Sequence, residues 1–235
     1  MSKSSSNQVA AFGKLVGICN DLGASYNPSR VSLKTTALAT LLKQAQQSSE
    51  AVIVAQQNFT MRVNERIEGF KGVPKLAARI IRASSASGVS AENLRDLIAL
   101  KAMVQRGRVG KRALLKTMEG EPVKPSSGRF DYETRIEMMA RLIQTVSGIR
   151  SYAPNEIDLK VASLKSWLVG LRTLNEQVAR AASALERARA KRRKFLFAST
   201  GIYGTGNAVK NYIRSIEGVR GELSNAVSGI SFTIM

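Results

Sequence analysis

Histidine is absent from this chain, and cysteine, proline and aromatic residues are scarce. The 235 residues include no His, one Cys and five Pro, and only 6% are Phe, Trp or Tyr. Without histidine there is no Ser–His or Cys–His nucleophile pair and no imidazole to ligate a metal or shuttle protons. The single thiol, Cys19, cannot form an intrachain disulfide or a thiolate zinc cluster. These absences remove most familiar enzyme chemistry, and we expect neither catalysis nor a cofactor.

Long apolar runs are also lacking. The apolar stretch beginning at Val9 is interrupted by Lys14, so it is shorter than the roughly 7–15 residues of a secretory signal. Before Cys19, Ile18 stands where a lipoprotein cleavage site needs a small residue. No window approaches the roughly 18 apolar residues of a membrane span. We therefore expect a cytoplasmic protein with no membrane span.

The residues that are present favour helices. Hydrophobic residues make up 44% of the chain, enough for a sizeable core, while strand-forming aromatics are few. Apolar residues recur at steps of three and four in 132–146 and again through a stretch without helix breakers at 156–198. A similar stretch covers 32–68. We expect a weak point in each stretch, the polar run 46–49 in the first and Gly170 in the second. A helix of about 40 residues is near 60 Å long.

An internal repeat accounts for the similarity of these long stretches. Shifting the chain by 126 positions aligns 25–66 with 151–192 without gaps, and 11 of the 42 positions are identical. Several identical pairs are apolar, and each copy has a Tyr-x-Pro break before its long stretch, Tyr26 with Pro28 and Tyr152 with Pro154. Asn155 is the expected N-cap of the second long helix. The pattern predicts a duplicated helical unit.

The repeat defines the expected organisation. It predicts a first helical repeat over 1–105, a basic linker and loop over 106–130, and a second repeat over 131–235, packed as one domain. After glycines near 69–72 and at Gly201, the chain is expected to turn back and continue in further helices, which are 73–84, 91–104, 208–216 and 222–227. Pairing the two long helices antiparallel would bury both apolar stripes. The predicted fold is an all-α, internally duplicated antiparallel bundle of about six to eight helices.

Several short blocks carry a family resemblance. They are Phe12–Cys19, Tyr132–Ile136, Tyr152–Glu156 with Leu159–Leu164, and Val227–Phe232. Together they resemble a family of small, uncharacterised cytoplasmic proteins from Bacteroidetes-type bacteria, with the Tyr-x-Pro-Asn-Glu block as the most specific element. The resemblance implies a helical fold and a bacterial origin. It implies no activity and no catalytic residues.

Two motifs that sometimes carry chemistry have simpler interpretations here. Asp131, Glu133 and Glu137 lie near one helix start, where acids favour the helix dipole, and arginines are at hand to pair with them. The glycine-rich segment 201–207 lacks both the Gly-Lys-Ser/Thr ending of a phosphate loop and the preceding strand of a dinucleotide turn. We interpret it as a flexible turn between two antiparallel helices.

Two single residues are likewise interpreted as structural. Cys19 lies among apolar helical residues and is expected to pack as a small hydrophobe. Trp167, the sole tryptophan, lies in the leucine stripe and is expected in the core or at an oligomer contact rather than as a ligand platform.

Positive charge is the one functional signal. The chain has 36 Lys and Arg against 17 Asp and Glu, a formal net charge of +19. One dense cluster consists of Arg187, Arg189, Lys191, Arg192, Arg193 and Lys194. A second consists of Arg106, Arg108, Lys111 and Arg112. A looser third cluster, Arg62, Arg66, Lys71, Lys75, Arg79 and Arg82, matches the first in its place at the end of a long helix.

Complementing helix dipoles needs only a few cations, so the excess is expected to attract a polyanion, which could be RNA, DNA or an anionic membrane surface. Few aromatics lie among the basic residues, which disfavours stacking of bases. The sequence therefore predicts a non-enzymatic structural or accessory factor that binds nucleic-acid phosphates through the first two clusters, without sequence specificity. The alternative is a self-assembling scaffold or filament subunit, a homo-oligomer without a nucleic-acid role.

Overall fold

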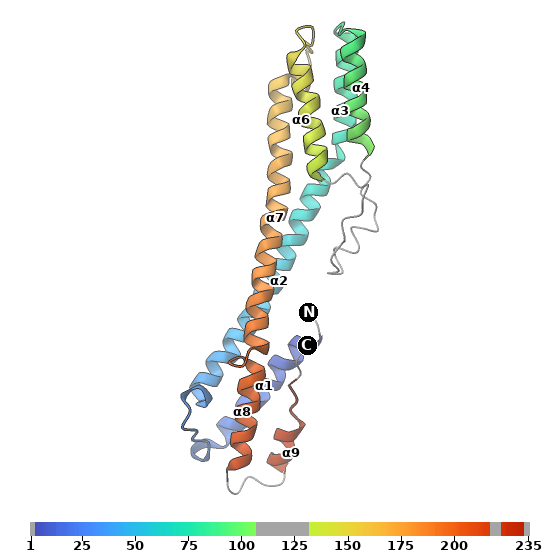
Figure 1. Cartoon of the computed structure of the whole chain (residues 1–235). Helices are drawn as coiled ribbons and strands as arrows, with labels where there is room; N and C mark the ends of the chain where they lie inside the picture. Colours follow the sequence, from blue (N-terminus) through green and yellow to red (C-terminus); the bar gives the residue numbers. More distant parts are fainter. Residues whose placement is uncertain (1–2, 107–131, 217–221, 233–235) are drawn as a thin grey trace. The chain divides into compact units, whose positions relative to one another are not determined.

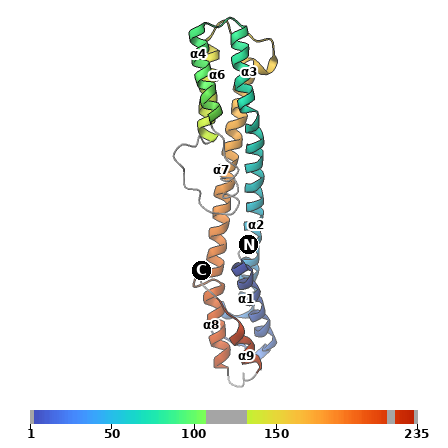
Figure 2. The ribbon, with the colours of Figure 1, turned by 90° about the vertical axis from the view of Figure 1, so that its right-hand side faces the viewer.

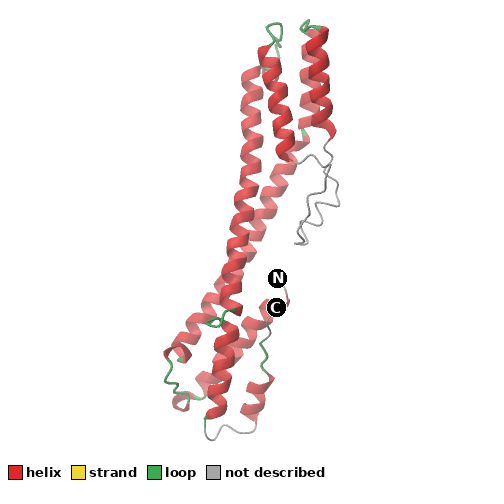
Figure 3. Cartoon of the chain, in the orientation of Figure 1, coloured by secondary structure: helices red, strands yellow, loops and turns green. Residues whose placement is uncertain are grey.

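The described part of the chain is helical throughout. The computed structural model describes residues 3–106, 132–216 and 222–232, and no strand occurs among them (Figure 3). The helices are α1 (Lys3–Asp21), α2 (Thr35–Lys71), α3 (Val73–Ala86), α4 (Ala91–Arg106), α6 (Tyr132–Gly148), α7 (Val161–Phe197), α8 (Ile202–Ser215) and α9 (Glu222–Gly229), with short 3-10 helices η1 (Gly23–Ser25), η2 (Val31–Leu33) and η3 (Ile157–Leu159). The predicted all-α class is confirmed. Within the described ranges, no helix combines the length and the apolar character needed to cross a bilayer.

The chain forms two compact units. The terminal unit contains residues 1–57 and 182–235, and the central unit contains residues 58–181. The units divide after residue 57, within α2, and after residue 181, within α7. Each of these two 37-residue helices therefore contributes to both units. The units therefore differ from the predicted repeats 1–105 and 131–235: each joins the beginning of one repeat to the end of the other.

The central unit is a bundle of the end of α2, helices α3, α4 and α6, and the beginning of α7 (Figures 1 and 2). Its core includes fully buried Ile80 of α3, Leu97 of α4, Met139 of α6 and Leu164 of α7. Within this unit α2 and α7 run antiparallel, as predicted. Arg66 donates from Nη1 to Asn175 Oδ1 at 2.9 Å, and residues further along α2 contact residues earlier in α7, such as Gly69 beside Leu174.

The terminal unit packs α1, α8 and α9 with the beginning of α2 and the end of α7 (Figure 1). Fully buried Phe12 and Leu15 of α1, Leu38 of α2, Leu196 of α7 and Ile213 of α8 form much of its core. Helix α8 contacts α1, α9 and η2.

The same set of neighbours occurs in both units. In the central unit α3 contacts α4, α6 and η3, and α4 contacts α6; in the terminal unit α8 contacts α9, α1 and η2, and α9 contacts α1. A shift of 126 residues also carries both ends of η2 onto the ends of η3, and both ends of α2 onto the ends of α7. A duplicated unit would produce these correspondences. The duplication itself stays a prediction.

Both long helices begin later than predicted. The Tyr-x-Pro break is followed by a 3-10 turn and one extended residue, Lys34 or Lys160, and only then by the α-helix. The prediction of Asn155 as N-cap is therefore wrong, because α7 starts at Val161 and η3 is preceded by Glu156 with no side-chain cap. The expected weak points do not break either helix. Ser48 and Ser49 donate to the Ala45 carbonyl within α2, and Gly170 lies within α7.

The chain does not turn back where the sequence suggested. Helix α3 continues in the direction of α2, and α8 continues in the direction of α7 (Figures 1 and 2). One residue, Gly72, joins α2 to α3, whereas reversing a helix needs a loop of about 2–5 residues. Between α7 and α8, Gly201 N–H donates to Ala198 and Thr205 N–H donates to Gly201, which keeps helix-like bonding across the break.

Candidate phosphate-binding surface

The densest predicted cluster lies on the last turns of α7, in the terminal unit. Positions three and four apart lie on one face of a helix, so Arg187, Lys191 and Lys194 form a row along α7. All three are exposed, and so is Arg193, which is next to Lys194 in the chain but about 120° from Arg187 round the helix. Helical geometry places the row opposite Leu196, which is fully buried in the core. At 1.5 Å per residue the row is about 10 Å long. We call these four residues the α7 row.

The other two members of the cluster face the protein. Arg189 Nη1 donates to Glu186 Oε1 at 2.8 Å, and its Nη2 donates to Gln56 Oε1 at 3.0 Å. Arg192 is partly buried, and burial, reinforced by the charges of Arg189 and Arg193, lowers the pKa of its guanidinium. An arginine does not release its proton near neutral pH, so the lowered pKa means that the charge is held at a cost. A bound anion would reduce that cost.

Acidic residues close to the α7 row in the chain are few. Residues 182–215 contain eight Lys and Arg but one acid, Glu186, which is already paired with Arg189. None of the ion pairs formed between described residues involves a member of the α7 row. The row therefore presents four exposed cations that are free to meet an external anion.

The second predicted cluster is only partly described. Arg106 is the last residue of α4, in the central unit. Arg108, Lys111 and Arg112 lie outside the described residues, as does the predicted linker beyond Arg106. Of the ten predicted binding residues, the structure brings together the six on α7.

The looser third cluster is largely used within the central unit. Arg62 pairs with Glu65 at 2.8 Å, Lys71 pairs with Glu68, and Arg79 pairs with Asp158. The third cluster therefore has fewer unpaired cations than the cluster on α7. Two of its members, Lys75 and Arg82 of α3, are exposed.

Arg66 of this third cluster is a structural residue. Its guanidinium carbon lies 4.0 Å from the centre of the Tyr132 ring, and it donates to Asn175. Burial lowers the pKa of Arg66, as it does that of Arg192, which is the residue 126 positions later. The end of each long helix thus holds one partly buried arginine at the same position.

The remaining motifs do not form a reactive site. Glu133 accepts a hydrogen bond of 2.7 Å from Asn175 Nδ2, and Glu137 pairs with Arg141; Asp131 lies outside the described residues. Across the described residues, no three His, Cys, Asp or Glu side chains come together as a group that could hold a metal ion. Cys19 is fully buried, and burial raises the pKa of its thiol to about 11, so the thiolate needed for reactivity is disfavoured.

The glycine-rich segment is helical rather than a flexible turn. Helix α8 begins at Ile202, six residues before the predicted start. The interpretation of 201–207 as a turn is wrong: residues 202–207 belong to α8, and Gly204 lets the first turn of this helix lie against the α7–α8 connection. A Cβ on Gly204 would lie 1.9 Å from the backbone oxygen of Ser199.

Sequence reasoning missed one feature, an open pocket beside Trp167. The indole packs against the core of the central unit, as expected, but it also lines a pocket together with Lys75 and Arg79 of α3. These cations are about ninety positions away in the chain, so no local pattern joins them to the tryptophan. The one available signal was the spacing of Lys75, Arg79 and Arg82, which places them on one face of α3.

Comparisons with known proteins add no relative. No protein-family model, curated protein or solved structure matches this chain.

Proposed function

We propose that this chain is a non-enzymatic helical protein that binds the phosphate backbone of nucleic acid as a structural or accessory factor. The observation that supports this most directly is the α7 row, Arg187, Lys191, Arg193 and Lys194, which is exposed, forms no ion pair with a described residue and lies in a chain segment, 182–215, with one acidic residue. Arg and Lys side chains bind phosphate through charge-assisted hydrogen bonds. The helix fixes their backbone positions, so only the side chains need to become ordered on binding.

The helix dipole explains only part of this cluster. Cations in the last turn of a helix are favourable, typically by 0.3–1 kcal/mol each, and the effect fades beyond that turn. Arg187 and Lys191 lie one to two turns before the last turn of α7, and the charges around Arg192 already repel one another. A polyanion would offset that repulsion, whereas the dipole would not.

The test compares two variants of equal charge. The row variant replaces Arg187, Lys191, Arg193 and Lys194 with Gln. The matched control replaces four exposed cations scattered elsewhere in the terminal unit, which are Lys14, Arg30, Lys34 and Lys43, with Gln. Filter binding at several salt concentrations, with two unrelated duplexes, gives affinity and salt dependence for wild type and both variants.

We expect the row variant to bind more weakly and with a shallower dependence on salt. Removing one cation that binds a phosphate reduces the slope of log affinity against log salt by about 0.9 for duplex DNA. The reduction should be the same for both duplexes, because phosphates carry no sequence information. The control should keep most of the wild-type slope. No binding by wild type at about 50 mM salt would contradict the proposal, and equal slopes for the two variants would move the site to Arg106, Arg108, Lys111 and Arg112.

Self-assembly into a scaffold or filament is the second candidate function. It is favoured by two large apolar side chains at equivalent positions of the two units, Val31 and Ile157, whose exposed fractions are 72% and 76%. An assembly held by apolar contacts would persist at 1 M salt, whereas charge-mediated contacts would not. Light scattering at low and high salt, with Val31→Ser and Ile157→Ser as variants, tests this candidate.

A further inference from the structure

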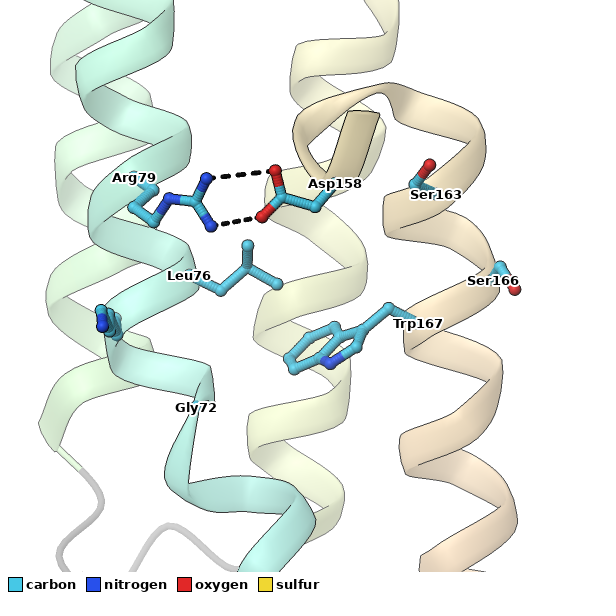
Figure 4. Close-up of a pocket in the computed structure, with 8 residues that line it drawn as sticks. Gly72, Leu76, Arg79, Asp158, Ser163, Ser166 and Trp167 are labelled. Carbon is cyan, nitrogen blue, oxygen red and sulfur yellow. Dashed lines mark hydrogen bonds and ion pairs between the residues drawn. The ribbon is translucent and has the colours of Figure 1, made fainter. Parts of the chain in front are cut away.

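A pocket of the central unit combines an aromatic face with positive charge. It lies between α3 and the beginning of α7, has a volume of about 650 Å³, and is lined by Gly72, Lys75, Leu76, Arg79, Asp158, Ser163, Ser166 and Trp167. Figure 4 shows the Trp167 ring extending from α7 below Leu76, with Arg79 and Asp158 meeting above. The volume falls within the range of about 300–1,000 Å³ that is typical of ligand sites.

The lining offers three kinds of contact. Trp167 is partly buried and supplies a fixed ring, held by its packing on the core. Lys75 is exposed and Arg79 is partly exposed, and both come from one face of α3. Ser163 and Ser166 add hydroxyl groups from α7. An aromatic face, two cations and hydroxyl groups together match a planar base joined to a sugar phosphate.

We propose that this pocket binds one nucleotide of single-stranded nucleic acid, with the base stacked on Trp167 and its phosphate held by Lys75 and Arg79. The proposal rests on the proposed function and adds a second contact surface, in the other unit, that recognises unpaired bases. A base inside a duplex is stacked on its neighbours and cannot lie on the indole, so the pocket would select single strands.

A second pocket adjoins the Trp167 pocket and shares the cation Arg79 with it. This second pocket has a volume of about 600 Å³ and is also lined by Arg82 of α3 and by residues of the α6–α7 connection that include Ser151, Asn155 and the acidic Glu156. Lys75, Arg79 and Arg82 follow one face of α3, about 6 and 4.5 Å apart along its axis. A strand leaving the Trp167 pocket would therefore meet the further positive charge of Arg82, and also the carboxylate of Glu156 on the opposite wall of the second pocket.

Asp158 competes with the phosphate for Arg79. Arg79 Nη2 donates to Asp158 Oδ1 at 3.1 Å, and a second bond joins the same two groups. The side chains remain 38% and 56% exposed, so water and an incoming phosphate can reach them. Removing the carboxylate would free Arg79 and tighten binding. Removing Asp158 should therefore raise the affinity for the strand, whereas removing Lys75 or Trp167 should lower it.

The tryptophan provides its own readout, because it is the sole Trp of the chain. Indole fluorescence of the full-length wild-type protein is titrated with a dodecamer of deoxythymidylate, a duplex of the same length, inorganic polyphosphate and thymidine monophosphate. We expect quenching by the single-stranded dodecamer and little change with polyphosphate or duplex, even where these bind. The dodecamer should bind at least about tenfold more tightly than the mononucleotide, because a longer strand also meets the neighbouring cations.

Variants assign the contacts. Filter binding of the dodecamer should weaken by about 5- to 150-fold for Trp167→Leu, the range expected from removing one stacked base, and Trp167→Phe should restore part of the affinity. Lys75→Gln should reduce the salt slope by about 0.7. Asp158→Asn should tighten binding more than Asp96→Asn, a change of the same charge at an exposed position on α4.

The outcomes separate this inference from the proposed function. Equal quenching by polyphosphate and the dodecamer, or equal affinity for the mononucleotide and the dodecamer, would overturn it. So would dodecamer binding that does not depend on Trp167 or Lys75, and in that case binding through the α7 row would stand. A wild-type protein that binds no nucleic acid would overturn both. The wild-type fluorescence arm decides the question even if Trp167→Leu fails to fold.

Discussion

The hydroxyl of Tyr152 donates a hydrogen bond of 2.9 Å to the backbone carbonyl oxygen of Leu159, seven residues later. Both residues are buried, and the bond ties the Tyr-x-Pro segment to the end of η3, immediately before α7 begins. Tyr26 makes the equivalent bond, of 2.8 Å, to Leu33 before α2. Each long helix is thus preceded by a turn that is closed by a tyrosine.

The first prediction concerns this closure. Tyr152→Phe and Tyr26→Phe each remove one donor and leave a buried carbonyl without it, which costs about 1–3 kcal/mol. We expect each variant to lower the free energy of unfolding by about 1–2 kcal/mol in urea titrations followed by circular dichroism. Tyr203→Phe is the matched control, since its hydroxyl has no hydrogen bond to another described residue, and it should stay within about 0.5 kcal/mol of wild type. A cost equal to that of the control would show that the bonds contribute nothing.

The second prediction concerns two glycines within helices. A Cβ on Gly204 of α8 would lie 1.9 Å from the Ser199 oxygen, whereas a Cβ on Gly170 of α7 would meet nothing within 4 Å. We expect Gly204→Ala to destabilise the protein by about 1–3 kcal/mol through overpacking against backbone. Gly170→Ala should stabilise it by about 0.5–1 kcal/mol, because alanine is the better helix former. The thermal midpoints of the two variants should move in opposite directions, and a shift in the same direction would contradict the account.

The third prediction compares Arg66, which we expect to stabilise the fold, with Arg187, which we expect to bind nucleic acid. Arg66 contacts the Tyr132 ring and Asn175 in the central unit. Arg66→Met keeps an apolar stem but removes both of these interactions, and we expect it to cost about 1–2 kcal/mol of unfolding free energy. Arg187→Met removes an exposed charge and should change stability by no more than about 0.5 kcal/mol. In DNA binding the order should be reversed: Arg187→Met should weaken it more than Arg66→Met.

The positions of most helices and the antiparallel arrangement of α2 and α7 could be predicted from the sequence, but the directions of α3 and α8 could not. Apolar periodicity placed α2, α3, α4, α6 and α7 close to their observed bounds, because one buried stripe is enough to define a helix. The glycines near the ends of α2 and α7 were interpreted as reversals. Glycine marks a break in a helix but does not set the direction of the next one; the length of the connection does, and one residue, Gly72, is too short to reverse the chain.

The candidate site shows the same division between local and distant information. The α7 row could be predicted because its four cations lie within eight consecutive residues. The sequence could not predict which of the six cluster residues are free to bind an anion. That depends on the contacts of Arg189 with Glu186 and Gln56 and on the burial of Arg192. The pocket beside Trp167 was outside the reach of sequence analysis altogether, because its cations come from α3 and its ring from α7.

The fourth prediction uses Cys19 to follow the pH dependence of stability. The thiol is fully buried in the core of the terminal unit, and burial raises its pKa from 9.0 to about 11. Above pH 9 the unfolded chain loses the proton while the folded protein keeps it, so folding stability falls as the pH rises towards 11. Below pH 9 both states hold the proton and the contribution is constant. Two pKa units correspond to a decrease on the order of 2 kcal/mol.

The measurement is the urea midpoint at pH 8, 9, 10 and 11 for wild type and Cys19→Ala. Tyr26 and Tyr152 also have raised pKa values and contribute above pH 10. Burial raises the pKa of both, but Cys19 raises the pKa of Tyr26 further, so Tyr26 does not contribute equally in the two proteins. The same comparison is therefore made in a Tyr26→Phe background, where the effect of Cys19→Ala on the pH dependence reports the thiol alone, whatever fixed cost the smaller alanine brings to the core. We expect the variant to start less stable at pH 8 and to close part of the gap by pH 11. Parallel curves would mean that the thiol ionises as readily in the folded protein as in the unfolded chain, and so that the core around Cys19 is open to water.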